Sequence, residues 1–265
     1  MNHASNNQLN YIRQHKKKRS LIKLIRIGIL FLFLITWELA VDTHRIDGFF
    51  FSSPSRIVVC IQQMASDGSL FSHIGITLLE TIISFSLVIG ISILFSTLLW
   101  SSNYLSDICE PYLIALNSLP KSALAPLFIV WLGTGLKTII VAGISVSIFG
   151  SVIMIYTGFT SADREKIKLI KTLGGTKTDA FLKVVLPSSL PTLLSSAKVN
   201  IGLSLVGVVI GEFLAARSGL GYLIIYGSQV FKLDMVIMSI FILCIISMLL
   251  YALLQMFEKK LRGRY

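Results

Sequence analysis

The sequence predicts an all-α polytopic membrane protein with six transmembrane helices. Of its 265 residues, 54% are hydrophobic and only 14% are charged, whereas a typical soluble domain carries about 25% charged residues. The mean hydropathy of +0.78 is that of a chain dissolved in lipid. Long uncharged runs recur along the chain, and a membrane-spanning helix needs about 20 residues. Six such helices leave no room for a large soluble domain, which argues against an ordinary soluble enzyme.

The first element is a basic tail, residues 1–20, which precedes an apolar segment at residues 21–41. Lys23 and Arg26 lie inside that segment, and their long stems can carry the charge to the membrane interface. The uncharged centre is short, so a cleaved secretory signal peptide is an alternative. We favour an uncleaved first helix, because no clear small-residue cleavage site follows.

A short surface helix is expected next. Ser53-Pro54-Ser55 is typical of a turn followed by a helix start. Apolar residues then recur at helical spacing, at Ile57, Val58, Ile61 and Met64. An amphipathic helix of this kind can lie on the membrane surface.

Five further spans follow from the remaining apolar runs. They are expected at residues 77–102, 112–134, 138–160, 195–215 and 235–256. The last is the clearest, since residues 235–254 carry no charge. The run at 112–134 contains Pro120, Lys121 and Pro126, so a broken helix is expected there.

Lys and Arg are concentrated on one predicted side of the membrane. Eighteen of the 24 lie in the N-terminal region, in the segment 164–198 or in the C-terminal tail. With six spans these regions share one side, and an excess of Lys and Arg marks the cytoplasmic side. The transmembrane domain is therefore expected at residues 21–258, with cytoplasmic tails at residues 1–20 and 259–265. This orientation accounts for the net charge of +11, and nucleic-acid binding is not expected.

One substantial polar loop, residues 163–191, separates the fourth and fifth spans. Ile167, Ile170 and Leu173 recur between charged residues, which predicts a short amphipathic helix. Gly174 and the glycine after it predict the end of that helix, because glycine accepts the left-handed conformation common at helix ends.

A second short helix is predicted within the same loop. Thr176 and Asp179 fit the pattern in which a hydroxyl and an acid three residues later start a helix. Ala180, Phe181, Val184 and Val185 then share one face. Pro187 and Pro191 are expected to break the chain before the fifth span. Such a jointed helix pair either rests on lipid or docks a cytoplasmic partner, and periodicity alone does not separate the two.

The 163–191 loop resembles the EAA loop of ABC-importer permeases. The resemblance rests on Thr172-Leu173-Gly174, Phe181, Val184-Val185-Leu186-Pro187 and Pro191. Nearly the whole chain after residue 20 is similar to the nitrate, sulfonate and taurine branch of that family. The matching pieces are Ser53-Pro54-Ser55, residues 118–127 with 131–135, and Gly211-Glu212-Phe213 with residues 218–222. The chain departs from the family at Lys168-Leu169-Ile170, which replaces the Glu-Ala-Ala triplet, and at Glu80, which stands at a basic position.

The resemblance implies a type I ABC-importer permease fold and ATP-driven import of a small solute. That solute would be a sulfonate, nitrate or taurine-like compound, or a vitamin-precursor-like compound. The partners would be a cytoplasmic ABC ATPase coupled through the 163–191 loop, an extracellular or periplasmic substrate-binding protein, and a second permease copy. The two permease copies would lie in the bacterial cytoplasmic (inner) membrane. The ATPase contact would be made by Leu173, Gly174, Phe181, Leu186 and Pro187.

The chain itself is not expected to be an enzyme. It contains no GxxxxGK[ST] phosphate-binding loop, so ATP hydrolysis is expected in the partner and no cofactor in this chain. Its three cysteines form no CxxC or Cys/His pair, so no metal site is expected.

Two ionisable residues are candidates for the translocation path or gate. Lys121 lies in an apolar run, where a lysine usually faces a cavity or a partner. It either lines the path of an anionic substrate or reaches the interface from a broken helix. Glu212 precedes a glycine-rich stretch, residues 218–221, and either positions a gate or pairs with a neighbour.

The sequence allows two alternatives to an importer permease. A stand-alone secondary transporter or channel would usually bury a carboxylate deep in a span, yet residues 81–106, 138–162 and 235–254 contain no acid. An intramembrane serine protease would need a histidine near a serine such as Ser145, and no histidine follows His73. Both are therefore less well supported than an importer permease.

Overall fold

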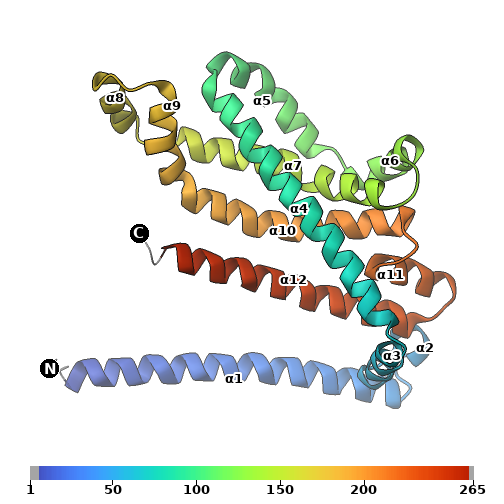
Figure 1. Ribbon diagram of the computed structural model, residues 1–265. Coiled ribbons are helices and arrows are strands. Elements are labelled where there is room, and N and C mark those ends of the chain that lie inside the picture. Colours follow the sequence, from blue (N-terminus) through green and yellow to red (C-terminus); the bar gives the residue numbers. More distant parts are fainter. Residues whose placement is uncertain (1–5, 263–265) are drawn as a thin grey trace. The chain divides into compact units, whose positions relative to one another are not determined.

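The computed structural model describes residues 6–262 (Figure 1), which form helices joined by short turns and contain no strand. By its internal contacts the chain divides into two compact units, at residue 63. Each unit is described by itself. The all-α fold class expected from the sequence is confirmed.

The N-terminal unit contains α1 (Asn6–Asp42), α2 (Gly48–Phe51) and the start of α3 (Pro54–Ser66). Its two long helices are joined by one carboxylate. Glu38 of α1 accepts hydrogen bonds from the backbone N–H of Ser55, at 3.0 Å, and from the Ser55 hydroxyl, at 2.6 Å. This contact places the start of the expected surface helix, α3, against the end of the first apolar helix.

The core of the second unit is formed by α4 (Ser69–Ser101), α7 (Leu136–Thr160) and α10 (Leu186–Ala215). The crossing of α7 and α10 is close because glycines meet there. A Cβ atom added to Gly207 would lie 2.8 Å from the Cα atom of Gly143. Small residues of this kind let helix backbones approach closely in a membrane, where burial of apolar surface does not drive association.

Hydrogen bonds also join these core helices. The Ser96 hydroxyl of α4 donates to the carbonyl oxygen of Val152 in α7 at 2.9 Å. The Asn200 amide of α10 donates to the Ser151 hydroxyl of α7 at 2.8 Å. These buried polar groups therefore find hydrogen-bond partners within the bundle, which offsets the free-energy cost of burying them.

The expected span 112–134 is a bent pair of helices. α5 (Asn103–Ser118) is followed by the 3₁₀ helix η1 (Lys121–Leu124) and by α6 (Ala125–Leu132), and the two arms meet at 86°. The bend falls at Pro120, which has no N–H to continue the helix and disfavours helical conformation in the residue before it. The first helix of the pair, α5, also begins at Asn103, earlier than the expected start at residue 112.

The 163–191 loop contains the two predicted short helices, α8 (Arg164–Thr172) and α9 (Lys177–Ala180). The expected break at Pro187 and Pro191 is not found, because the chain stays helical from residue 177 to residue 215. A π-helical turn, η2 (Phe181–Val185), joins α9 to α10. Pro187 directly follows this π turn and has no N–H to donate back along the helix, and Pro191 lies inside α10.

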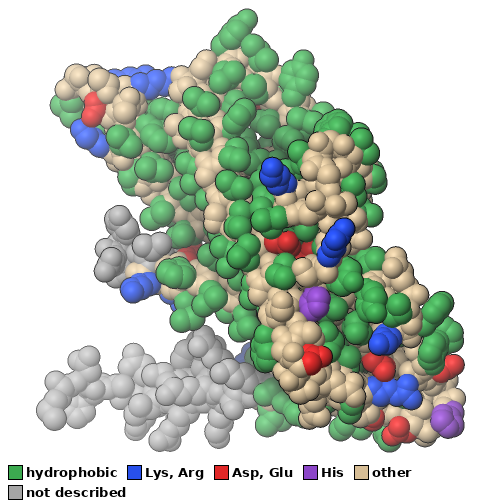
Figure 2. Space-filling model, turned by 45° about the vertical axis from the view of Figure 1, so that its right-hand side comes forward, with side chains coloured by type: hydrophobic (Ala, Val, Ile, Leu, Met, Phe, Trp, Pro, Cys, Tyr) green, Lys and Arg blue, Asp and Glu red, His purple; other side chains and the backbone are tan. Residues whose placement is uncertain are grey.

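The chain ends with α11 (Leu220–Gln229) and α12 (Leu233–Arg262). Five helices among the described residues are long and apolar enough to cross a membrane, or six if the bent pair is one span. They cover residues 24–42, 69–101, 136–160, 177–215 and 233–260, with the bent pair at 103–132. Hydrophobic side chains cover much of the visible surface (Figure 2), as expected where lipid replaces water.

Candidate functional site

The turn between α8 and α9 is a sharp elbow, residues 173–176. Gly174 has a φ of +78°, a backbone conformation that residues other than glycine and asparagine rarely adopt. The N–H of Gly174 donates to Lys171 O at 3.0 Å, and that of Gly175 to Ile170 O at 2.9 Å. These bonds satisfy the last carbonyl groups of α8, so the predicted glycine elbow is confirmed.

The start of α9 is fixed by a reciprocal pair of hydrogen bonds. The N–H of Asp179 donates to the Thr176 hydroxyl at 3.2 Å, and the N–H of Thr176 donates to the Asp179 carboxylate at 2.9 Å. This capping box, which the sequence predicted, satisfies two N–H groups that the helix leaves unpaired. The elbow therefore has a defined shape.

The elbow presents apolar side chains to the outside. Leu173 is 76% exposed and Leu169, on α8, is 58% exposed. Leu182, one turn after the elbow, is also exposed. Three exposed leucines in a charged loop form a surface suited to a protein partner.

The five predicted coupling residues divide into two groups. Leu173 and Gly174 lie at the elbow, and Pro187 is exposed at the start of α10. Phe181 and Leu186 face inward instead, against a buried cluster that includes Phe159 and Val185. This second pair holds the loop to the bundle.

An aromatic group makes that attachment. The ring of Phe181 lies 5.1 Å from the ring of Trp100, at the end of α4, and 5.3 Å from that of Phe159, near the end of α7. The Lys177 ammonium donates to the carbonyl oxygen of Ser101 at 2.6 Å and lies 5.5 Å from the centre of the Trp100 ring. The cation thereby neutralises an unpaired carbonyl at the C-terminus of α4 and adds a cation–π contact. Sequence reasoning missed Lys177 and Trp100, because no local pattern links them.

Lys121 is placed by the bend after α5. Its ammonium donates to the carbonyl oxygen of Asn117, in the last turn of that helix. A cation there complements the negative end of the helix dipole. The Lys121 ammonium is thereby tied to the break between α5 and α6.

Glu212 lies in the last turn of α10 and is buried. One carboxylate oxygen accepts from the Thr77 hydroxyl of α4 at 2.7 Å, and the other accepts from the N–H of Gly221, in the first turn of α11. The N–H of Leu220 in turn donates to the Thr77 oxygen at 2.8 Å. A carboxylate at a helix N-terminus is stabilised by the unpaired N–H groups there. Glu212 therefore fixes the glycine-rich turn against α4.

Glycine is required where this turn passes Glu212. Gly219 has a φ of +114°, and a Cβ atom there would overlap the Glu212 carboxyl group. A Cβ atom at Gly221 would lie 2.7 Å from a carboxylate oxygen of Glu212. Glycine is therefore needed at both positions, because the Glu212 carboxyl group packs directly against the backbone of this turn.

Glu80 lies one helical turn beyond Thr77, on the same face of α4. Its carboxyl group lies against that of Glu212. The side chain is only 3% exposed, and its Oε2 atom has no hydrogen-bond partner among the described residues. The two carboxyl groups are thus neighbours in a buried setting. From the sequence, Glu80 was visible only as an acid at a position where the resemblance implies a basic residue.

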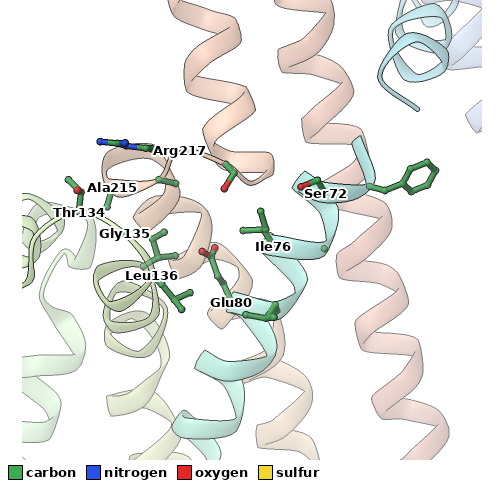
Figure 3. Close-up of a pocket in the computed structure, with 14 residues that line it drawn as sticks. Ser72, Ile76, Glu80, Thr134, Gly135, Leu136, Ala215 and Arg217 are labelled. Carbon is green, nitrogen blue, oxygen red and sulfur yellow. The ribbon is translucent and has the colours of Figure 1, made fainter. Parts of the chain in front are cut away.

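Glu80 also borders a cavity of about 760 Å³. Residues from α4, from the start of α7 and from the end of α10 line it (Figure 3). Ile76, Leu79, Leu136 and Ile139 make much of the wall apolar, and Arg217 lies at the exposed rim. We call this cavity the acidic pocket.

The helical bundle with its exposed, jointed loop has the architecture of a membrane transport subunit. A family model described as the binding-protein-dependent transport system inner membrane component matches residues 86–263. The chain belongs to this family, and the resemblance to ABC-importer permeases is confirmed. It is a multi-pass membrane protein and a permease subunit of an ABC importer.

Individual relatives agree with this assignment. The chain is 29% identical over 242 residues to the formylaminopyrimidine transport permease protein ThiX of Halalkalibacterium halodurans, covering 91% of this chain and 96% of the relative. It is 26% identical over 209 residues to the putative aliphatic sulfonates transport permease protein SsuC of Bacillus subtilis, covering 79% and 76%. A solved structure of the MetNI methionine ABC transporter has the same fold, with a TM-score of 0.63, 19% identity, and 72% of this chain and 95% of that chain covered.

Proposed function

We propose that a separate ATPase docks on the elbow of the 163–191 loop and drives solute import through this permease. The observation that carries the proposal is the combination of an exposed apolar elbow with a buried attachment. Leu169 and Leu173 are free to enter a groove of a partner, while Phe181 is fixed between Trp100 and Phe159. A force applied to the elbow is therefore passed to the ends of α4 and α7.

The same force is passed along α10. The chain is helical from residue 177 to residue 215, a length of roughly 58 Å at 1.5 Å per residue. Glu212, near its far end, is bonded to Thr77 and to Gly221. One continuous helix therefore connects the docking elbow with the acidic pocket. Movement of rigid helices past one another is a general way of opening a site on alternate sides.

The remaining partners and the orientation belong to the same proposal. The basic 163–191 loop and both termini face the cytoplasm of a bacterial cell, because their Lys and Arg residues mark that side. A second copy of this chain completes the permease, and an external binding protein delivers the solute. ATP is hydrolysed by the partner and not by this chain.

The solute is proposed to be a small organic compound. The relatives named above are described as permeases for formylaminopyrimidine and for aliphatic sulfonates. Nitrate and taurine-like compounds remain within the proposal, since the resemblance covers that branch.

Docking is tested by replacing Leu173 with aspartate. We expect Leu173→Asp to abolish co-purification of the ATPase, because a charge replaces an exposed apolar contact, while the permease stays folded. Val230→Asp is the matched control, since Val230 is also exposed and lies in the α11–α12 connection, away from α8 and α9 (Figure 1). If the ATPase still binds Leu173→Asp with wild-type affinity, or if purified permease transports solute without any ATPase, the proposal is wrong.

A further inference from the structure

Glu212 is surrounded by hydrogen-bond donors where α10, α11 and α4 meet. The Thr77 hydroxyl accepts from the N–H of Leu220 at 2.8 Å, and it donates its own hydrogen to one carboxylate oxygen of Glu212 at 2.7 Å. The other oxygen of Glu212 accepts from the N–H of Gly221. Donors on both oxygens stabilise the ionised form of a carboxyl group, which is a pure acceptor. Glu212 is therefore the negative member of this cluster.

Glu80 brings a second carboxyl group to the same place. It lies three residues after Thr77 on the same face of α4, it is 3% exposed, and its carboxyl group lies against that of Glu212. Within residues 6–262, none of the ion pairs includes either acid. Two neighbouring carboxylates that are buried without a cation repel each other, so only one of them stays ionised.

The other titratable groups described around this pair do not supply that cation. His73, on α4, accepts the N–H of Gly219 at Nδ1, at 2.9 Å, so this nitrogen carries no proton. Tyr222, on α11, stacks on the His73 ring. Arg217 lies at the exposed rim of the acidic pocket, and Lys137, in the first turn of α7, is exposed. Water and salt screen the charge of an exposed side chain.

The surroundings of the two acids decide which of them is neutral. Oε2 of Glu80 is buried and has no hydrogen-bond partner among the residues that the structure describes. A negative charge on Glu80 would therefore be buried without a donor, whereas Glu212 has a donor at each oxygen. A protonated Glu80 has an O–H group that it can donate to Glu212. The proton thus belongs on Glu80.

We propose that Glu80 and Glu212 form a proton-binding site, in which Glu80 holds one proton while α4, α10 and the start of α11 are packed together. When these elements separate, water enters from the acidic pocket, which Glu80 borders (Figure 3). The O–H bond of Glu80 then breaks, the proton passes to that water, and Glu80 is left ionised. Opening at this end therefore releases a proton, and by linkage a lower pH favours the packed state. The role of this opening in import rests on the proposed function, whereas the binding of the proton does not.

Infrared spectroscopy tests for the proton directly. The purified permease, in a detergent without ester groups at neutral pH, should show the carbonyl stretching band of a protonated carboxyl group. Glu80→Gln should remove this band, while its amide keeps an N–H donor of similar shape toward Glu212. Glu110→Gln, which replaces an exposed acid on α5, is the matched control and should leave the band unchanged. A spectrum of Glu80→Gln that has lost no such band relative to the wild type would overturn the proposal.

The pH dependence of stability gives a second readout. The folded chain holds a proton on Glu80 that the unfolded chain gives up once the pH exceeds the range in which a free glutamate titrates. The unfolded state then binds fewer protons, so wild-type stability falls as the pH rises. Relative to Glu80→Gln, the folding equilibrium constant should fall by about tenfold for each pH unit, the linkage of one proton. Denaturation curves of both proteins over the same pH series measure this ratio, and a constant ratio would contradict the site.

The proton site and the proposed function fail in different ways. Retention of the ATPase by Leu173→Asp would overturn the proposed coupling and leave the infrared result standing. An unchanged infrared spectrum in Glu80→Gln would overturn the proton site while docking of the ATPase is untouched. In vesicles that contain the permease with its ATPase and binding protein, wild-type import should slow as the external pH falls. Glu80→Gln should import slowly at every pH, and an equal response to pH in both proteins would overturn the link between the proton and opening.

Discussion

The ammonium group of Lys177 lies 2.6 Å from the carbonyl oxygen of Ser101, joining the start of α9 to the end of α4 across 76 positions of the chain. The same ammonium group sits over the Trp100 ring. A single side chain therefore connects the jointed loop with a core helix of the bundle. This contact explains how a short loop can act on a helix far from it in sequence.

Replacing Lys177 should separate ATP hydrolysis from transport. We expect Lys177→Met to leave the ATPase bound and active but to lower the amount of solute imported per ATP, because the loop is no longer tied to α4. The cation–π contact is worth only about 0.5–1 kcal/mol at an exposed site, so the fold should persist. Lys183→Gln is the control, since Lys183 pairs with Asp179 at 3.0 Å on the exposed surface. Equal coupling ratios in both variants would contradict this role.

The elbow should tolerate only residues that accept a positive φ. Gly174→Val forces a β-branched side chain to +78°, a strain of about 1–3 kcal/mol. We expect weakened ATPase binding and slower coupled uptake. Gly174→Asn should recover much of both, because asparagine enters the left-handed region more readily. A valine variant that couples as fast as the asparagine variant would show that the conformation of the elbow is not needed.

The crossing of α7 and α10 should be the most sensitive packing site. Gly207→Val would place side-chain atoms against the Gly143 backbone and the carbonyl oxygen of Ala142, which a Cβ atom alone would approach to 2.9 Å. Overpacking of this kind destabilises by about 1–3 kcal/mol, and thermal unfolding of the purified permease measures it. Gly202→Ala, at an open position of the same helix, should be neutral or stabilising. Similar melting temperatures for the two variants would rule out this close crossing.

The ion pair between α10 and α12 should show strong coupling between its partners. Lys198 lies 2.7 Å from Glu258, and both side chains are largely buried. Lys198→Met removes one partner of this largely buried ion pair, which we expect to lower the free energy of unfolding. The double variant Lys198→Met/Glu258→Gln should regain most of that loss. Additive effects in a double-mutant cycle of denaturation free energies would show that the two charges do not interact.

Features set by neighbouring residues could be predicted from the sequence. The uncharged runs located the long helices, because lipid selects length and apolarity directly. The elbow and the capping box followed from Gly174, Thr176 and Asp179, whose hydrogen bonds all lie within a few positions. In each case the interactions between residues close in sequence were enough to predict the structure.

Features that depend on distant partners could not be predicted. The hydrogen bond between Thr77 and Glu212 joins residues 135 positions apart, and no periodicity in the sequence indicates it. The burial of Glu80 beside Glu212 could therefore not be predicted. The direction of Phe181 likewise depends on Trp100 and Phe159. Pro187 was expected to break the chain, yet the helix continues through a π turn that directly precedes the proline.

That π turn has a mechanical consequence. A π turn bonds five residues back and so contains one residue more than a regular helical turn. Each residue rotates a helix by about 100°, so the extra residue sets the angle between the Leu173 side of the elbow and the faces of α10. Migration of the turn by a few residues would rotate one segment against the other. Under the proposed coupling, a push delivered at the elbow would therefore reach the bundle together with a rotation.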